Sequence, residues 1–330
     1  MKVARTAHKV FFSPIFAVCA LMATAPTIAA EPQFPTGTVK IVVPFPAGGP
    51  TDVLVRIIQQ NLQKIWSGTP VIVENKPGGD TIIGTNAVAK SAPDGHTLGV
   101  VVTAHTINPI LRDKMPYDTL KDLAGVTQLV NTPLALVAYS GAPFNTVREL
   151  IDYGKKNPGK ISYATPGSGT STHLAGELFK NEAGVDIMHV PYKGSVPAQL
   201  DLAAGRVDVM FDVFSSALPL VKGGKLKLIA QSLDHRLANY EKYPAIAETV
   251  PGFNVTSIIG VVAPAATPKA VLSRIQADIA KAMKSPDVQE RLVSFAMEPV
   301  ASTPEQFDLV IRSEIKRWEK IVKVNNVHAN

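Results

Sequence analysis

Residues 39–52, VKIVVPFPAGGPTD, decide the fold that the sequence predicts. A buried strand runs into a glycine-rich turn, and a helix starts directly after the turn at Pro50. Backbone N–H groups and the positive end of a helix dipole converge in such a turn, which therefore suits an anion. The turn has neither the Lys and Ser/Thr of a Walker loop nor the G-x-G-x-x-G of a dinucleotide fold. With Phe45 and Pro46 beside it, the turn favours a small organic anion with an apolar body over a nucleotide.

A second unit of the same plan occupies residues 160–184, KISYATPGSGTSTHLAGELFKNEAG. Its strand is predicted to end near Thr165, its loop holds Gly167 and Gly169, and its helix begins near residue 171 or 172. Strand-like and helix-like runs also alternate along most of the chain, which predicts an α/β fold with largely parallel sheets.

Two such units far apart in the sequence predict two lobes that face each other. The segments near Thr132 and Gly252 are candidate crossings between the lobes. The predicted lobes are residues 31–131 with 252–330, and residues 132–251. Ligands in sheets of this kind bind beyond the carboxyl ends of the strands, so we expect the ligand cleft between the two glycine-rich loops.

The first thirty residues are typical of an export signal. Three cations precede a mostly apolar run over residues 10–25, and small residues offer a cleavage site near Ala30. The alternative is an uncleaved membrane anchor, but the apolar run is short and broken by Pro14, whereas a membrane span needs ~20 residues. Cys19 is the chain's one cysteine and lies inside this signal, so the mature chain suits an oxidising compartment.

Charge and spacing exclude some classes of partner. Removal of the three signal cations lowers the formal net charge from +6 to +3, and the remaining charges are spread along the chain. A nucleic-acid interface would need a basic stripe with interleaved aromatics, which the sequence lacks. The histidines show no metal-binding spacing. We therefore predict no nucleic acid, no metal and no cofactor.

Several motifs occur in a fixed order: VPFPAGGPTD, NKPGG, SAPDGHTL, INPILRDKMPYDTLKDL, ATPGSGTSTHLAGELF, HVPYKGSVPAQLDLAAGRVDVMFD and APAATP. Together they resemble the Bug family, the extracytoplasmic receptors of tripartite tricarboxylate transporters. The resemblance implies a type II periplasmic binding protein of two α/β lobes that close over a ligand. It also implies binding of a carboxylate without catalysis, a periplasmic location, a monomer, and membrane transporter subunits as partners.

The resemblance carries over to particular residues, with one glycine-rich loop from each lobe gripping a carboxylate. The first-lobe loop corresponds to Phe45, Pro46, Ala47, Gly48, Gly49 and Asp52, and the second-lobe loop to Thr165, Gly167, Gly169, Thr170 and His173. The chain departs from the family pattern at Asp80, where small residues are usual, and at Ile258, where a Trp is frequent. These two positions are the expected determinants of specificity if they face the ligand.

Each loop residue also has a purely structural interpretation. Gly48 and Gly49 could only make a tight turn, although two matching turns favour ligand contact. Asp52 is expected chiefly to stabilise the start of its helix. The hydroxyls of residues 168 and 170–172 could cap a helix or bind an oxyanion; we expect one to cap, and Thr170 to reach the ligand.

Ser168 and His173 invite a rival interpretation as an exported hydrolase. TPGSGT lacks the G-x-S-x-G spacing of a nucleophile elbow, so we expect His173 to orient the loop by hydrogen bonding. Thr103 and His105 come after a strand and could line the cleft, and Asp212 could reach the cleft or cap the next segment of the chain. A receptor that signals to a membrane kinase is a further alternative to transport.

Overall fold

In the computed structural model, a mixed sheet of ten strands forms the centre of the described chain, which comprises residues 34–192, 194–325 and 327 with 1, 2 and 4. The strands are β1 (Val39–Val43), β2 (Val71–Asn75), β3 (Thr97–Val102), β4 (Leu123–Tyr139), β5 (Ile161–Thr165), β6 (Ile187–Pro191), β7 (Val209–Val213), β8 (Leu226–Gln231), β9 (Thr256–Pro264) and β10 (Glu298–Pro299). The predicted cleavage site and the apolar run of the export signal lie outside the described residues.

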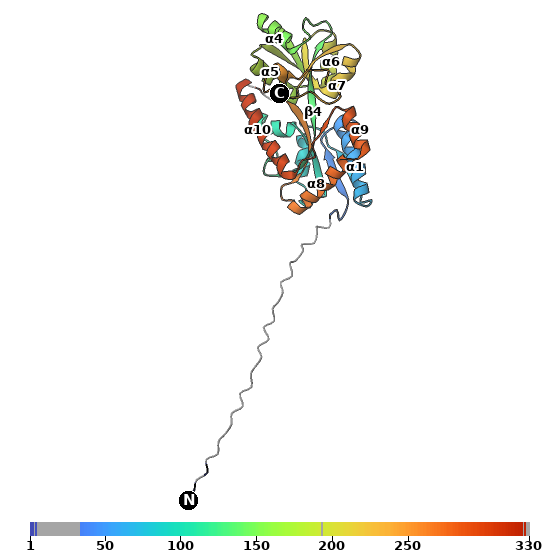
Figure 1. The fold of residues 1–330 in the computed structure, drawn as a ribbon, viewed down its shortest axis with the longest axis vertical. Helices are drawn as coiled ribbons and strands as arrows, with labels where there is room; N and C mark the ends of the chain where they lie inside the picture. The colour runs from blue at the N-terminus through green and yellow to red at the C-terminus, as the bar shows by residue number, and fades with distance from the viewer. Residues whose placement is uncertain (3, 5–33, 193, 326, 328–330) are drawn as a thin grey trace. The chain divides into compact units, whose positions relative to one another are not determined.

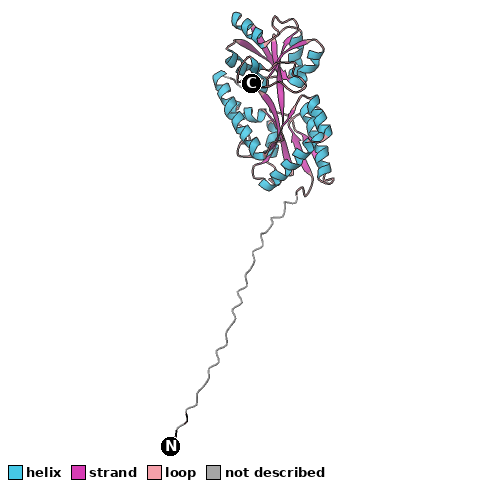
Figure 2. Cartoon of the chain, in the orientation of Figure 1, coloured by secondary structure: helices cyan, strands magenta, loops and turns pink. Residues whose placement is uncertain are grey.

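Helices flank the strands (Figure 2), so the predicted α/β class is confirmed. They are α1 (Pro50–Ile65), α2 (Ile82–Ala89), α3 (Ala104–Leu111), α4 (Val147–Lys156), α5 (Ser171–Ala183), α6 (Ser195–Ala203), α7 (Phe214–Lys222), α8 (Lys269–Met283), α9 (Pro286–Ser294) and α10 (Pro304–Asn325). No helix of the described residues is both long and apolar enough to cross a membrane.

The long strand β4 belongs to two groups of strands. Its first part, residues 123–133, pairs antiparallel with β9, which continues through β3 to the parallel pairs of β1 with β2 and β3. Its second part, residues 134–139, pairs with β7 and β8, and β7 continues through parallel β5 to β6. We call these the first and second strand groups. The strand change near residue 133 falls beside the predicted crossing at Thr132, while the lobe boundaries themselves stay a prediction.

Each strand group has apolar cores on its two faces. Successive residues of β4 alternate between them: Leu134 and Leu136 pack with one core of the second group, Ala135 and Val137 with the other. In Figure 1, α4 to α7 gather at one end of β4, while α1, α8 and α9 gather at the other. The glycine-rich loops after β1 and β5 are thereby attached to buried strands.

Helix α10 contributes to cores of both groups. Phe307 and Ile311, in its first half, pack with the core that contains Val42 and Val101 of the first group. Trp318, in its second half, packs with the second group's core. The apolar stripe of this helix, Phe307, Ile311, Trp318 and Val322, is therefore buried, and it ties residues late in the chain to both strand groups.

Local signals located α1 correctly. Gly49 is its N-cap and Pro50 its first residue, and Gly68 comes after its end with a φ of +88°. Two helices were missed, because α3 and α7 are only 8 and 9 residues long and each contains an internal proline. The sequence pattern PLALVAYS, residues 133–140, predicts a strand that covers only the second half of β4.

Candidate functional site

Two neighbouring cavities share lining residues Phe45, Val102 and Ser257. The first, which we call the Gly169 cavity, measures about 230 Å³ and is bordered by residues 168–171 of the second glycine-rich loop. The other, the Pro46 cavity, measures about 470 Å³ and is bordered by the first loop. Phe45 thus lies between them. The predicted residues that line a cavity are Phe45, Pro46, Ala47, Gly49, Asp52, Thr103, Ser168, Gly169 and Thr170.

A buried carboxylate holds the first loop in shape. Asp52, only 1% exposed, accepts hydrogen bonds from the Gly48 N–H at 2.8 Å and from Arg56 Nε at 2.9 Å. Asn75 Nδ2 donates to Asp52 Oδ1 at 2.8 Å and to the Phe45 carbonyl at 3.0 Å. Burial acts to raise the pKa of Asp52, but the hydrogen bonds from Arg56, Gly48 and Asn75 outweigh it and hold the pKa below its ordinary value. Asp52 is therefore an anion, and its hydrogen bonds are made to the first loop and the residues that support it.

A buried histidine holds the second loop in the same way. The Gly169 N–H donates to His173 Nδ1 at 3.0 Å, and Gly169 has the left-handed φ of +74° that favours glycine. In both loops a glycine N–H thus donates to a side chain four residues later, on the third residue of the adjoining helix. The expectation that His173 orients the loop agrees with this geometry. The difference is charge: Asp52 is anionic, whereas His173 is neutral.

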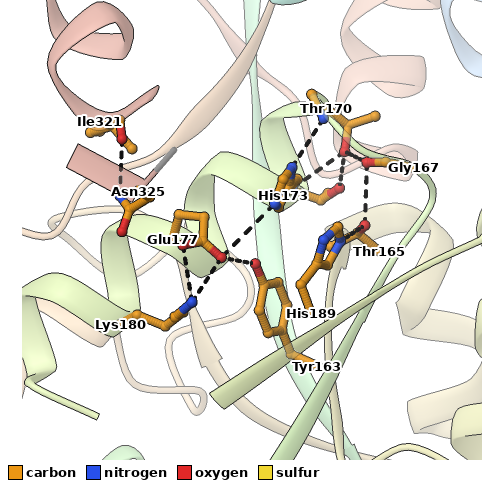
Figure 3. A network of polar contacts seen from close by, with 12 residues as sticks. Tyr163, Thr165, Gly167, Thr170, His173, Glu177, Lys180, His189, Ile321 and Asn325 are labelled. Atoms are coloured by element: carbon orange, nitrogen blue, oxygen red, sulfur yellow. Dashed lines mark hydrogen bonds and ion pairs between the residues drawn. The ribbon is translucent and has the colours of Figure 1, made fainter. Parts of the chain in front are cut away.

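His173 is buried in a polar network beneath the second loop (Figure 3). Its ring stacks on His189 with centroids 3.8 Å apart, and His189 Nε2 lies 2.6 Å from Thr165 Oγ1. Glu177 accepts from Tyr163 Oη at 2.5 Å and pairs with Lys180 at 3.1 Å. Burial, with a smaller contribution from Lys180, lowers the pKa of His173 to about 4. Because Nδ1 accepts from Gly169, neutral His173 carries its proton on Nε2.

Thr170 lines the Gly169 cavity, but its hydroxyl is occupied in the loop. Thr170 Oγ1 donates to the Gly167 carbonyl at 2.7 Å and accepts from the His173 N–H at 3.3 Å, so Thr170 is the N-cap of α5. The choice of Thr170 as the ligand-binding hydroxyl therefore conflicts with its role as the cap. Ser168 and Ser171 are the other hydroxyl residues of this loop at the cavity wall.

Four predicted residues support the loops without bordering either cavity. Gly48 makes the turn with a φ of +90°, and Gly167 supplies a carbonyl to Thr165 and Thr170. Thr165 is fully buried against His189, and the His173 ring lies beneath the loop. These residues shape the site from below.

His105 faces another part of the molecule, contrary to prediction. It lies on α3 and borders a separate cavity of about 150 Å³ together with Thr119, Asp308 and Arg312. It is fully buried, neither ring nitrogen has a hydrogen-bond partner among the described residues, and burial lowers its pKa to about 4. The sequence predicted only that His105 follows a strand, whereas a helix begins after Thr103 and turns the His105 side chain away from the ligand cavities.

The sequence left two roles open for Asp212, contact with the cleft or capping of the next segment, and its hydrogen bonds are structural. Its carboxylate is fully buried and accepts from Ser195 Oγ at 3.0 Å, Gln199 Nε2 at 2.6 Å and the Val213 N–H at 2.9 Å. Burial raises its pKa in spite of these hydrogen bonds. The residue fastens α6 to the end of β7, and it borders neither ligand cavity.

The two departures from the family pattern have different outcomes. Ile258 is buried in the core with Phe307, and its N–H donates to Thr103 Oγ1 at 2.9 Å, so its side chain borders neither cavity. Asp80 does line the Gly169 cavity. Among the described residues, no group of three His, Cys, Asp or Glu side chains could hold a metal ion.

Sequence reasoning missed the cation at this site. Arg112 comes directly after the last residue of α3, lines the Gly169 cavity and forms an ion pair with Asp80. Asn108, four residues earlier, lines the same cavity and donates to the Asp80 carbonyl at 2.9 Å. The spacing of Asn108 and Arg112 would have signalled one helix face, had α3 been recognised.

The chain is similar to known proteins in both sequence and fold. The family described as "Tripartite tricarboxylate transporter family receptor" matches residues 54–327. Protein BugT of Bordetella pertussis is 33% identical over 293 residues, which are 88% of this chain and 90% of BugT. The structure of R. palustris Rpa4515 with adipate covers 90% of this chain and 100% of its own, at 32% identity and a TM-score of 0.78. MatC from Rhodopseudomonas palustris with bound malate covers 88% and 100%, at 32% identity and a TM-score of 0.72.

The α/β fold that this chain shares with solved relatives, among them the periplasmic binding protein BugD, is that of a periplasmic solute-binding receptor. The chain belongs to the tripartite tricarboxylate transporter receptor family, and the resemblance to the Bug proteins is confirmed.

Proposed function

We propose that this receptor captures a small organic carboxylate at the Gly169 cavity and delivers it to the membrane subunits of a tripartite tricarboxylate transporter. The observation that carries the proposal is the second loop. The first turn of α5 has N–H groups without helical partners, and the side chain in that turn is neutral His173. In the first loop, Asp52 already supplies an anion to the start of α1. A carboxylate is therefore better accommodated at α5.

The solved relatives support a carboxylate as the ligand. Rpa4515 was solved with adipate and MatC with malate, and both share the fold of this chain over nearly its whole length. The Gly169 cavity adds apolar surface from Phe45, Val102 and Leu111 to its polar loop. Polar donors at one wall and apolar side chains elsewhere suit an organic acid.

Capture is proposed to close two lobes over the ligand. The lobes would be residues 31–131 with 252–330, and residues 132–251, with the exported protein acting as a monomer in the periplasm. Phe45 comes from one predicted lobe and Gly169 from the other, yet both line the Gly169 cavity. A ligand that contacts both favours the closed form, because only a difference in affinity between two states can shift their populations.

An exported hydrolase is not favoured by the arrangement. His173 Nδ1 accepts from Gly169 and its ring is stacked on His189 beneath the loop, outside both cavities. A general base must reach the proton that it removes.

The test is thermal unfolding of residues 31–330, refolded to strip bound ligand, against aliphatic, amino and aromatic carboxylates. A carboxylate at 100 times its Kd should stabilise the protein by about 2.7 kcal/mol and raise Tm by several degrees. Neutral analogues of the same acids, such as their amides, are the control. Stabilisation by the amides equal to that by the acids would contradict carboxylate recognition.

A further inference from the structure

The ion pair between Arg112 and Asp80 lies at the wall of the Gly169 cavity. Each of the two side chains remains partly exposed or has polar atoms without a hydrogen bond. Asp80 pairs with Arg112 through Oδ2, and its side chain is 70% exposed. The Arg112 side chain is 30% exposed, while its Nε is buried and makes no hydrogen bond. A guanidinium offers five donors in a planar fork, so Arg112 keeps donors for a second anion.

The backbone holds the two charges together on the cavity wall. Asn108 Nδ2 donates to the Asp80 carbonyl, which fastens the segment before α2 to α3. Asp80 and Thr81 adopt left-handed φ values of 51° and 78°, an unusual conformation that fixes the direction of the segment. Asp80 is therefore presented to Arg112 by its main chain as well as by charge.

The Asp80 contact is one that a ligand can displace. An exposed ion pair contributes little to stability, because water screens the charges and both side chains lose freedom. A carboxylate enclosed in the cavity and bound by both arms of the guanidinium makes a stronger interaction than a carboxylate exposed to water. Asp80 is thus paired with the guanidinium that an incoming anion would bind, and it would compete with that anion.

The other residues that line the Gly169 cavity indicate the chemical class of the ligand that carries this anion. Residues 168–171 border the same cavity and suit one carboxylate, while Phe45, Val102 and Leu111 supply apolar surface. On the basis of the proposed function, we propose that Arg112 binds the second carboxylate of an aliphatic dicarboxylate, and that Asp80 is a built-in competitor that limits the affinity. Arg112 and Asp80 are then the residues that separate dicarboxylates from monocarboxylates.

The experiment measures Kd by calorimetry for the α,ω-dicarboxylates from malonate to suberate and for the monocarboxylates of equal carbon number. The purified protein should prefer dicarboxylates. Arg112→Gln should weaken dicarboxylate binding by about tenfold to a hundredfold, the effect of losing one charged hydrogen-bonding group, and leave monocarboxylate binding within about twofold. Asp80→Asn should tighten dicarboxylate binding by about threefold or more, with monocarboxylates unchanged.

Arg206→Gln is the matched control, because Arg206 forms a similar surface pair with Asp201 at 2.7 Å and borders neither cavity. The Tm of each ligand-free variant checks folding, and Arg112→Lys should recover part of the dicarboxylate preference. Monocarboxylates that bind as tightly as dicarboxylates, or an Arg112→Gln effect equal for both series, would overturn the inference and leave the proposed function standing. Binding by neither series would overturn the inference, and the wider carboxylate panel would then decide the proposed function separately.

Discussion

At the scale of single residues, the two glycine-rich loops share one hydrogen-bonding arrangement but differ in charge. Gly48 donates to Asp52 and Gly169 donates to His173, each four residues later. The side chain that accepts the hydrogen bond fixes the loop and also sets the charge at the start of the adjoining helix. Anionic Asp52 fills that role at α1, whereas His173 is neutral and the first turn of α5 contains no acidic residue.

Replacement of His173 tests this device without any ligand. His173→Asn places an acceptor oxygen near the position of Nδ1, so the Gly169 amide should stay protected from hydrogen exchange. His173→Leu removes the acceptor, and the Gly169 amide should exchange about tenfold faster or more, because losing one hydrogen bond costs about 1 kcal/mol or more. Exchange mass spectrometry on peptides covering residues 166–175 measures the difference. Equal rates in the two variants would show that the His173 acceptor does not hold the loop.

The sequence located the residues whose roles are set by near neighbours. Gly49 and Pro50 were assigned correctly, because a cap and the first helical residue depend on the adjacent backbone. Arg112 was missed, because it reaches the cavity only when α3 packs against the segment that carries Asp80. The prediction that His105 lines the cleft was wrong for a related reason. α3 was not recognised, and the position of a residue around that helix decides which cavity its side chain borders.

At the scale of elements, β4 and α10 hold the two strand groups together. β4 pairs with β9 in its first part and with β7 and β8 in its second part. α10 buries Phe307 with the first group and Trp318 with the second. Bending between the groups must therefore be accommodated by β4 and α10 together.

Truncation of Trp318 should reveal the contribution of α10. The side chain is fully buried in the second group's core, so Trp318→Ala should lower the free energy of unfolding by about 3–5 kcal/mol. Leu309→Ala, on an exposed position of the same helix, should change it by no more than about 0.5 kcal/mol. Urea unfolding followed by circular dichroism measures both. A similar loss in the two variants would contradict the assignment of Trp318 to this core.

Element predictions succeeded where the pattern was long and failed where tertiary contacts decide. The stripe of α1 extends over 16 residues and was recognised. α3 has only 8 residues with Pro109 inside, and its position is fixed by packing on α10 and β3. β4 extends for 17 residues because different partner strands lie along it, and those partners are remote in sequence.

At the scale of the whole molecule, the buried histidines His105 and His173 and the half-buried His189 make the fold sensitive to acid. Burial lowers the pKa of His105 and of His173 to about 4, and burial together with the nearby His173 lowers that of His189 to about 3. The stacked pair of His173 and His189 cannot easily accept two charges at 3.8 Å. Each histidine is neutral in the folded chain and titrates near its ordinary value when the chain unfolds.

The sign of the pH dependence is set by these lowered values. Below about pH 6.5 the unfolded chain binds protons that the folded chain does not, so this stability is complete above that pH and is lost as the pH falls toward 4. We expect urea unfolding to show a loss of about 1–2 kcal/mol per histidine between pH 7 and pH 5. His105→Gln should reduce the total loss of unfolding free energy by the contribution of one histidine, about 1–2 kcal/mol. His235→Asn should not reduce it, because Glu298 and Asp234 raise the pKa of that exposed histidine. A loss unchanged in His105→Gln would contradict the neutral burial of His105.

The order of the strands along the chain also governs how the protein acquires its fold. The strands of the second group lie within residues 134–231, so their partners are close along the chain. In the first group, β3 pairs with β9, which is far along the chain. The hydrogen bond between Thr103 and Ile258, for example, joins residues 155 positions apart. Long-range pairing of this kind is slow, and an unpaired strand edge attracts other chains. When the polypeptide is made from its N-terminus, the second strand group can therefore complete its pairing before the first group. Until β9, in the last third of the chain, is available, one edge of β3 stays unpaired and prone to aggregation.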